Sequence, residues 1–281
     1  MPTLQAVDLP AGEATYFTAG PTDAPAVLLM HGGGLDCAQL SFRCLIPEAA
    51  KTHRVIAPNW PGYGGTKPLP KPYTIADLGV WMIGLLDALR VERASMIGIS
   101  MGGGAALWMA LNHGHRVDRL VPVATYGVAD RAPFHKVTFL LSKLPLNAVT
   151  FALMRRSDWF LRRSLASVFA DPDRITEELL AEVRQTLETA GDGEAFTKFQ
   201  RGEMALDRLR TVLTPRLSEV SHKTLFIHGW ADGLVPLAAV EEAARKMPHA
   251  RVSVLDAGHW PMREQPEAFN ALVTDFLQER P

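Results

Sequence analysis

Short apolar runs that end in glycine or polar residues recur along the chain. Such continuous runs are typical of strands buried on both faces of a parallel sheet. The runs lie at residues 25–31, 54–60, 93–99, 117–123, 223–229 and 250–256. Two further segments, residues 4–9 and 13–20, predict strands joined by a Pro-Ala-Gly turn.

Helical periodicity fills the spaces between several of these runs. Apolar residues recur at spacings of three and four in residues 74–91, which predicts an amphipathic helix. Residues 238–247 and 266–278 also predict helices. Because strands and helices alternate, we expect an α/β fold with a mostly parallel, doubly wound sheet.

The alternation is interrupted between residues 130 and 215. This segment contains no short apolar run bounded by turns, but it has helix-like stretches at residues 135–144, 147–156, 159–170 and 176–190. It is too long for a loop without structure of its own. We therefore predict a helical cap inserted between the sixth and seventh strands, with residues 1–129 and 216–281 forming the core.

Composition narrows the class of protein. The 281 residues are 47% hydrophobic and 21% charged, which is typical of a globular domain. The net charge of −1 provides no general attraction for nucleic acid. No signal-peptide pattern and no apolar run of about 18 residues is found, so we expect a cytoplasmic protein without membrane insertion. Cys37 and Cys44 are expected to be reduced thiols.

Residues 98–102 match the pattern G-x-S-x-G, directly after an apolar run and before an Ala-rich stretch. A serine at a very tight strand-to-helix turn is lifted out of the sheet, and bulky neighbours would clash there. The helix that follows favours developing negative charge at its N-terminus. This pattern predicts a nucleophile at Ser100; a Gly-rich turn whose serine merely caps the helix is the alternative.

A serine nucleophile needs a base and an orienting acid. His259 follows the last predicted strand, and Asp232 follows the strand before it, with Asp130 as a second candidate for the acid. The carboxyl ends of parallel strands meet at one edge of the sheet, and the order Ser, Asp, His suits this geometry. Glycines 32–34, after His31, would let backbone N–H groups approach a ligand closely.

Taken together, five motifs resemble the α/β-hydrolase family over nearly the whole chain. They are HGGG at 31–34, PGYGGT at 61–66, GISMGG at 98–103, HGWADGLVP at 228–236 and AGHWPMREQPEAF at 257–269. The resemblance implies Ser100 as nucleophile, His259 as base and Asp232 as acid. It also implies an oxyanion hole from the N–H groups of Met101 and Gly33, with Gly34 as a further donor, and a helical cap at the insertion.

The subgroup is less well defined by sequence. HGGG, the Ser-Met-Gly-Gly run and Trp260 resemble hydrolases that cleave carbon–carbon bonds in ring-opened aromatic dienones. That group usually has Gly-Pro-Gly where this chain has residues 34–36, and Asn where it has Ile99. Without a polar group beside the nucleophile, we expect an ester or lactone hydrolase, with carbon–carbon hydrolysis of a vinylogous diketone as the alternative. Ser100 argues against dehalogenases and epoxide hydrolases, which resemble this family but use Asp there.

Two readings from other classes stay open. Residues 98–104 also fit a dinucleotide-binding loop, and Tyr63 and Lys67 have the spacing of a short-chain dehydrogenase pair. Their order along the chain is the reverse of what that fold requires. A ligand receptor built on the α/β-hydrolase fold, with slow turnover, would retain an intact triad.

Large apolar side chains suggest a pocket for a small, largely apolar carbonyl substrate. The candidates are Phe139, Phe151 and Trp159 in the cap, with Trp60 and Trp260 on loops at the active edge. Lys and Arg are frequent between residues 131 and 163, which predicts a solvated basic face or, alternatively, a carboxylate-bearing substrate. No metal-ligand spacing is found, so no metal or cofactor is expected. A homodimer is compatible with the sequence.

Overall fold

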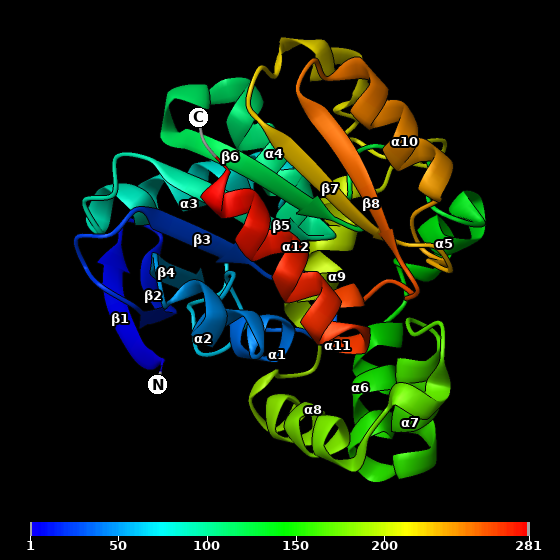
Figure 1. The fold of residues 1–281 in the computed structure, drawn as a ribbon. Helices are drawn as coiled ribbons and strands as arrows, with labels where there is room; N and C mark the ends of the chain where they lie inside the picture. The colour runs from blue at the N-terminus through cyan, green and yellow to red at the C-terminus, as the bar shows by residue number, and fades with distance from the viewer. Residues whose placement is uncertain (1, 280–281) are drawn as a thin grey trace.

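The computed structural model describes residues 2–279 (Figure 1). Its strands are β1 (Thr3–Leu9), β2 (Gly12–Ala19), β3 (Ala26–Met30), β4 (Arg54–Pro58), β5 (Ala94–Ile99), β6 (Val117–Val123), β7 (Thr224–Gly229) and β8 (Ala250–Leu255). Its helices are α1 (Ala38–Phe42), α2 (Leu45–Ala49), α3 (Ile75–Ala88), α4 (Met101–Asn112), α5 (His135–Leu141), α6 (Leu146–Arg156), α7 (Asp158–Ala166), α8 (Glu177–Thr189), α9 (Glu194–Glu203), α10 (Leu237–Lys246), α11 (Pro261–Glu264) and α12 (Pro266–Gln278).

All of these strands belong to one sheet, in the order β1-β2-β4-β3-β5-β6-β7-β8. The strands from β4 to β8 along this order pair in parallel, while β2 pairs antiparallel with both β1 and β4. The antiparallel hairpin thus closes one side of a sheet whose remaining strands all end at the same edge. This arrangement confirms the predicted α/β class and the mostly parallel sheet.

Helices cover both faces of the sheet (Figure 1). Leu28 and Met30 of β3 pack in the core beneath α3, α4 and α10. Val27 and Leu29 point to the opposite face and pack with α1, α2 and α12. Alternate residues of one strand therefore serve two cores, which explains why the central strands are apolar without interruption.

The predicted helix at residues 74–91 forms as α3, and its first residue is fixed by local chemistry. The Thr74 side chain accepts from the Asp77 backbone N–H, and Asp77 accepts from the Thr74 N–H in return. This reciprocal capping box satisfies two backbone donors that a helix N-terminus otherwise leaves free. The helix predicted at 266–278 is confirmed as α12 with the same bounds.

Residues 130–215, here called the cap segment, lie between β6 and β7 and contain α5 to α9. The segment leaves and re-enters the core at one place. Leu209 N–H donates to Asp130 O at 2.8 Å, and Leu213 N–H donates to Gly127 O at 2.8 Å. Helix α9 is the one α-helix of the segment that the sequence pattern did not predict. No single helix within residues 2–279 is long and apolar enough to cross a membrane.

Candidate active site

Ser100 occupies the turn between β5 and α4 in a conformation that few non-glycine residues adopt. Its φ is 51° and its ψ is −113°. Such a backbone costs free energy, and its usual place is a functional turn that the surrounding fold over-determines. The neighbouring glycines are required by space: a Cβ on Gly98 would lie 2.3 Å from Gly102 O, and one on Gly102 would lie 2.1 Å from Met30 O.

His259 and Asp232 form a hydrogen-bonded pair at the same edge of the sheet. His259 Nδ1 lies 2.8 Å from Asp232 Oδ2. The other carboxylate oxygen accepts the N–H groups of Leu234 at 2.8 Å and Val235 at 3.1 Å. Burial by itself would raise the pKa of Asp232, but the bond and charge of His259 and the two N–H bonds hold that pKa below its usual value. Asp232 is therefore an ionised acceptor that holds the imidazole proton on Nδ1, which leaves Nε2 of His259 available to accept a proton.

The alternative acid, Asp130, does not take this place. Its side chain is exposed, and its backbone carbonyl joins the two ends of the cap segment. Behind the pair, the buried His228 lies with Nε2 3.6 Å from Asp232 Oδ2. Burial lowers the pKa of His228, so this ring is neutral and donates to Val235 O at 3.0 Å.

The glycine loop after β3 is held by the His31 ring. His31 is fully buried, and burial lowers its pKa to about 3. Its Nδ1 lies 2.8 Å from Gly32 O, and its Nε2 accepts the Trp60 backbone N–H at 3.0 Å. The neutral ring thus joins two loops at the carboxyl edge, and Gly33 and Gly34 follow it directly.

A second buried group, the carboxylate of Asp36, holds the other end of the glycine loop by hydrogen bonds. Its carboxylate accepts the N–H groups of Gly32 and Cys37, each at 2.7 Å. Ser41 Oγ donates to it at 2.7 Å and accepts Trp260 Nε1 at 2.9 Å. Burial raises the pKa of Asp36 to about 7, against the effect of these donors. The glycine loop and the loop of His259 are therefore joined through one serine hydroxyl.

Two cavities meet at the candidate nucleophile. The first has a volume of about 380 Å³ and lies against α5, α9 and the start of the cap segment. The second has a volume of about 310 Å³ and lies against the glycine loop, α6 and α7. Both are lined by Gly33, Ser100, Phe196, Leu234 and His259. A carbonyl held at Ser100 would therefore have space on two sides.

Phe196 of α9 lies where the cavities meet, and the sequence did not predict a role for it. A Cβ on Gly33 would lie 2.7 Å from Cε2 of the Phe196 ring. The ring stacks on Phe199, with centroids 6.3 Å apart and an interplanar angle of 21°. Only a glycine at position 33 leaves room for this ring beside Ser100. The feature of the sequence that could have indicated this role is the pair of aromatic residues, three apart, within residues 194–203.

The predicted site residues fall into two groups. Met101 lines the first cavity, and Gly34, Phe151 and Trp260 line the second. The prediction that aromatic residues line the pocket is wrong for the other three, Trp60, Phe139 and Trp159, which line neither cavity. Trp60 is fully buried and donates Nε1 to His31 O at 2.8 Å. Phe139 packs under Lys143, whose Nζ is 4.6 Å from the ring centroid, and Trp159 is 73% exposed.

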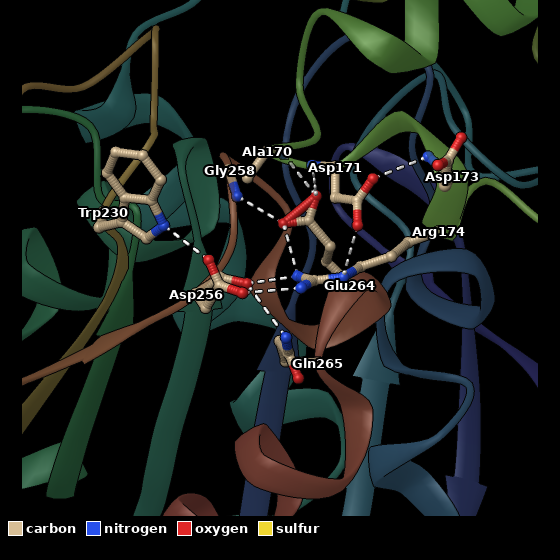
Figure 2. Close-up of polar contacts among 9 residues, drawn as sticks. All are labelled: Ala170, Asp171, Asp173, Arg174, Trp230, Asp256, Gly258, Glu264 and Gln265. Atoms are coloured by element: carbon tan, nitrogen blue, oxygen red, sulfur yellow. Dashed lines mark hydrogen bonds and ion pairs between the residues drawn. The ribbon is translucent and has the colours of Figure 1, made fainter.

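The buried carboxylate of Glu264 connects the loop of His259 to the cap segment by hydrogen bonds (Figure 2). Its side chain is fully buried. One oxygen accepts Gly258 N–H at 2.7 Å, next to His259 in the chain. The other accepts the N–H groups of Ala170 at 2.6 Å and Asp171 at 3.4 Å. Burial raises the pKa of Glu264, and these three bonds oppose the rise.

Arg174 of the cap segment adds ion pairs beside Glu264 (Figure 2). Its guanidinium pairs with Asp256 at 2.7 Å and lies 3.8 Å from Glu264. Asp256 also accepts Trp230 Nε1 at 2.7 Å. Beside these contacts, His259 N–H donates to Val168 O at 2.8 Å. The loop that carries the candidate base is therefore bonded to the stretch of the cap segment between α7 and α8.

Comparisons with known proteins show the family and the fold to which the chain is similar. Residues 25–266 match the family model described as the alpha/beta hydrolase fold. The chain is 33% identical over 262 residues to 2-hydroxymuconate semialdehyde hydrolase from Pseudomonas sp. (strain CF600), which covers 90% of this chain and 87% of that relative.

Two solved structures are similar over almost their full length. A meta-cleavage product hydrolase from Pseudomonas fluorescens IP01, complexed with acetates, superposes with a TM-score of 0.80 at 29% identity and 97% coverage of both chains. The enol-lactonase from Burkholderia xenovorans LB400 superposes with a TM-score of 0.79 at 25% identity, covering 98% of this chain and 100% of that one.

Proposed function

The chain belongs to the α/β-hydrolase family, and from this premise we propose that it is a serine hydrolase of a small, largely apolar carbonyl substrate. One observation carries the proposal. Ser100, in its strained turn, lines the same two cavities as His259, and His259 is bonded to the buried Asp232. This combination is the arrangement that nucleophilic catalysis by a serine requires.

In the first half of the reaction, Ser100 Oγ attacks the carbonyl carbon and His259 Nε2 takes the hydroxyl proton. Asp232 keeps the proton of the imidazole on Nδ1 and stabilises the imidazolium as it forms. The tetrahedral oxyanion accepts the N–H groups of Met101 and Gly33, with Gly34 as a further donor. His259 then gives its proton to the leaving group, which departs and leaves an acyl-enzyme on Ser100. Water attacks that ester with His259 as the base, and the carboxylic acid and the free serine result.

The first candidate reaction is hydrolysis of a carbon–carbon bond in a vinylogous diketone. The relative at 33% identity and the structure at 29% identity bear names of that chemistry. A carbon leaving group departs readily only as an enolate, so the bond must lie next to a second, conjugated carbonyl. Two cavities that meet at Ser100 fit a ketone with a substituent on each side. This support shifts the preference away from the ester or lactone that the sequence favoured.

Ester or lactone hydrolysis is the second candidate, because the groups beside the nucleophile are apolar. The residue before Ser100 is Ile99, which lines the second cavity and whose side chain has no donor for an enolate or carboxylate. No Lys or Arg within residues 2–279 lines the second cavity, and Arg131, on the first, is exposed. The enol-lactonase, at 25% identity, shows that a similar fold is found with a lactone-cleaving name.

We also propose that the cap segment is the lid of this site. Phe196 comes from α9 and Phe151 from α6, and both line a cavity that contains Ser100. A lid of this kind excludes water while the acyl-enzyme forms and sets the shape of the accepted substrate.

A panel of three substrates of equal size distinguishes the candidates. The panel is a 2-hydroxy-6-oxo-hexa-2,4-dienoate with an apolar 6-substituent, an aryl ester and an enol lactone, each with wild type and Ser100→Ala. A kcat/KM for the dienoate at least a hundredfold above the other two supports the first candidate, and the reverse ranking supports the second. Activity that survives in Ser100→Ala, or fluorophosphonate labelling that does, would refute the serine mechanism. A single turnover on every substrate would favour the receptor reading.

A further inference from the structure

Exposed apolar side chains are concentrated on the first half of the cap segment. Nine of the fifteen large apolar side chains that are exposed in residues 2–279 lie between residues 134 and 159. They are Phe134, Val137, Leu140, Leu141, Leu144, Leu146, Val149, Leu153 and Trp159. Single exposed apolar residues are ordinary, but a concentration of this kind marks an interaction surface.

These residues follow the periodicity of the two helices that carry them. Leu146, Val149 and Leu153 of α6 are spaced by three and four residues, so they share one face of the helix. Val137, Leu140 and Leu141 do the same on α5. The two helices meet at a bend of 80°. Each helix thus presents an apolar face that nothing in residues 2–279 covers.

The same part of the chain is strongly basic. Residues 131–163 contain seven Lys or Arg and one Asp, a net charge of +6 in a chain whose total is −1. The single acid, Asp158, is already paired with Arg184 at 2.7 Å. Lys136, Arg156 and Arg163 are exposed, and none of them takes part in a side-chain hydrogen bond or ion pair within residues 2–279.

From these two properties we infer that residues 134–163, here called the apolar basic surface, bind the face of an anionic lipid bilayer. The aliphatic and aromatic side chains would enter the boundary between headgroups and acyl chains, as interfacial amphipathic helices do. The Lys and Arg side chains can extend their stems along that layer and keep their charges among the lipid phosphates. Neither α5 nor α6 is long enough to cross a bilayer alone, and their bend of 80° lets both lie in the plane of the bilayer surface.

Charge favours this occupant over two others. A second copy docked face to face would bring together two surfaces that each have a net charge of +5, without acidic partners. A nucleic acid would pair with the basic side chains but would leave the nine apolar ones exposed to water. An anionic bilayer satisfies both the charge and the apolar area.

The surface also adjoins the site. Arg131, Ala132, Pro133 and Thr138 line the first cavity and belong to, or directly precede, the same stretch of chain. Adsorption would therefore hold this cavity close to apolar compounds dissolved in the bilayer.

Co-sedimentation of the full chain with vesicles tests the inference without any substrate, so the result does not depend on the proposed hydrolase activity. The vesicles are phosphatidylcholine alone, or phosphatidylcholine with about 30% phosphatidylglycerol. The wild type should bind the anionic vesicles at least twentyfold more tightly than the neutral ones and should be released by 0.5 M salt.

Two triple variants separate the apolar and charged parts. Leu146→Ser, Val149→Ser and Leu153→Ser together should weaken binding about a thousandfold, at roughly tenfold for each side chain. Lys136→Gln, Arg156→Gln and Arg163→Gln together should weaken it about a hundredfold, at roughly fivefold for each charge.

Matched controls change side chains of similar exposure elsewhere. They are Val80→Ser with Leu206→Ser and Val254→Ser, and Lys71→Gln with Arg90→Gln and Arg245→Gln. Both controls should bind within twofold of wild type, and circular dichroism melting verifies that every variant is folded. The inference is overturned if wild type does not bind the anionic vesicles, or if variants and controls bind equally. It is also overturned if the apolar triple variant only converts a dimer into monomers in sedimentation velocity, because the surface is then an interface between copies.

Discussion

The carboxylate of Glu264 should control the position of His259, and Glu264→Gln is the perturbation that tests this. The glutamine has the same shape but only one acceptor oxygen. Its amide NH₂ must therefore face either Gly258 N–H or the two N–H groups of Ala170 and Asp171. A buried N–H left without an acceptor costs about 1–3 kcal/mol.

Part of this free energy should raise the activation barrier of the reaction, because a displaced Gly258 also displaces His259, the next residue. A displacement of about 1 Å in a reacting group can lower a rate by about a hundredfold. We expect kcat to fall by roughly 30- to 100-fold, with KM changed by less than about threefold, since the cavity walls are retained. Activity is measured on the best substrate of the panel, and kcat is divided by the number of sites titrated with a fluorophosphonate.

Arg119→Met is the matched control for a loss of stability alone. Arg119 is buried at the start of β6 and donates to Phe276 O and Glu279 O, on elements that do not carry the candidate triad. It should lower the melting temperature but leave kcat per titrated site within about twofold. If Glu264→Gln lowers the melting temperature and also leaves kcat per site unchanged, the positioning role is refuted and Glu264 only supports the fold.

Three further expectations follow from the site. Asp232→Asn should lower kcat by roughly three to four orders of magnitude with folding intact, because the imidazole loses its tautomer and its counter-charge; a loss below tenfold would exclude Asp232 as the orienting acid. Phe196→Ala joins the two cavities and should change the ratio of kcat/KM between large and small substrates by about 10- to 100-fold, whereas Phe139→Ala should leave that ratio unaltered. Burial raises the pKa of Asp36 from 3.8 to about 7, so the folded protein binds that proton more tightly than the unfolded chain does. Stability should therefore fall between about pH 4 and pH 7, by up to about 4 kcal/mol. Asp36→Asn should flatten this part of the profile in urea titrations, and an unchanged slope would show that Asp36 has an ordinary pKa.

The parts of the fold with a strong local pattern could be predicted from sequence. Central strands such as β3 and β5 are buried on both faces, so every position is apolar and the run is unmistakable. The turn at Ser100 is equally specific, because two backbone approaches exclude any side chain at Gly98 and Gly102. The residues of this motif are consecutive in the chain, so the sequence displays it even though a distant strand imposes the glycine at position 102.

Side-chain direction in the cap segment and in the loops could not be predicted in the same way. Trp60 follows β4 at the active edge, but its indole is turned inward by the bond to His31 O. Trp159 lies in an apolar segment and yet is exposed, and apolar periodicity alone does not show which face of a helix is covered. The sequence pattern does not predict α9, because Gly191 and Gly193 precede a mostly polar stretch and Gly202 lies within it. Phe196 reaches Gly33 across many residues of sequence, and no local pattern reports that contact.

The meeting of the two ends of the cap segment has an evolutionary consequence. Because Leu209 N–H bonds to Asp130 O, the chain between them begins and ends at one place outside the strands, and recombination could replace it as a single cassette without disturbing strand register, nucleophile or base. The exception is the stretch around Ala170, whose N–H groups complete the acceptors on Glu264. A foreign cassette would have to supply equivalent donors before His259 was held in place. Substrate range in such an architecture can change by exchange of one gene fragment, but only among fragments that still fit the loop of the base.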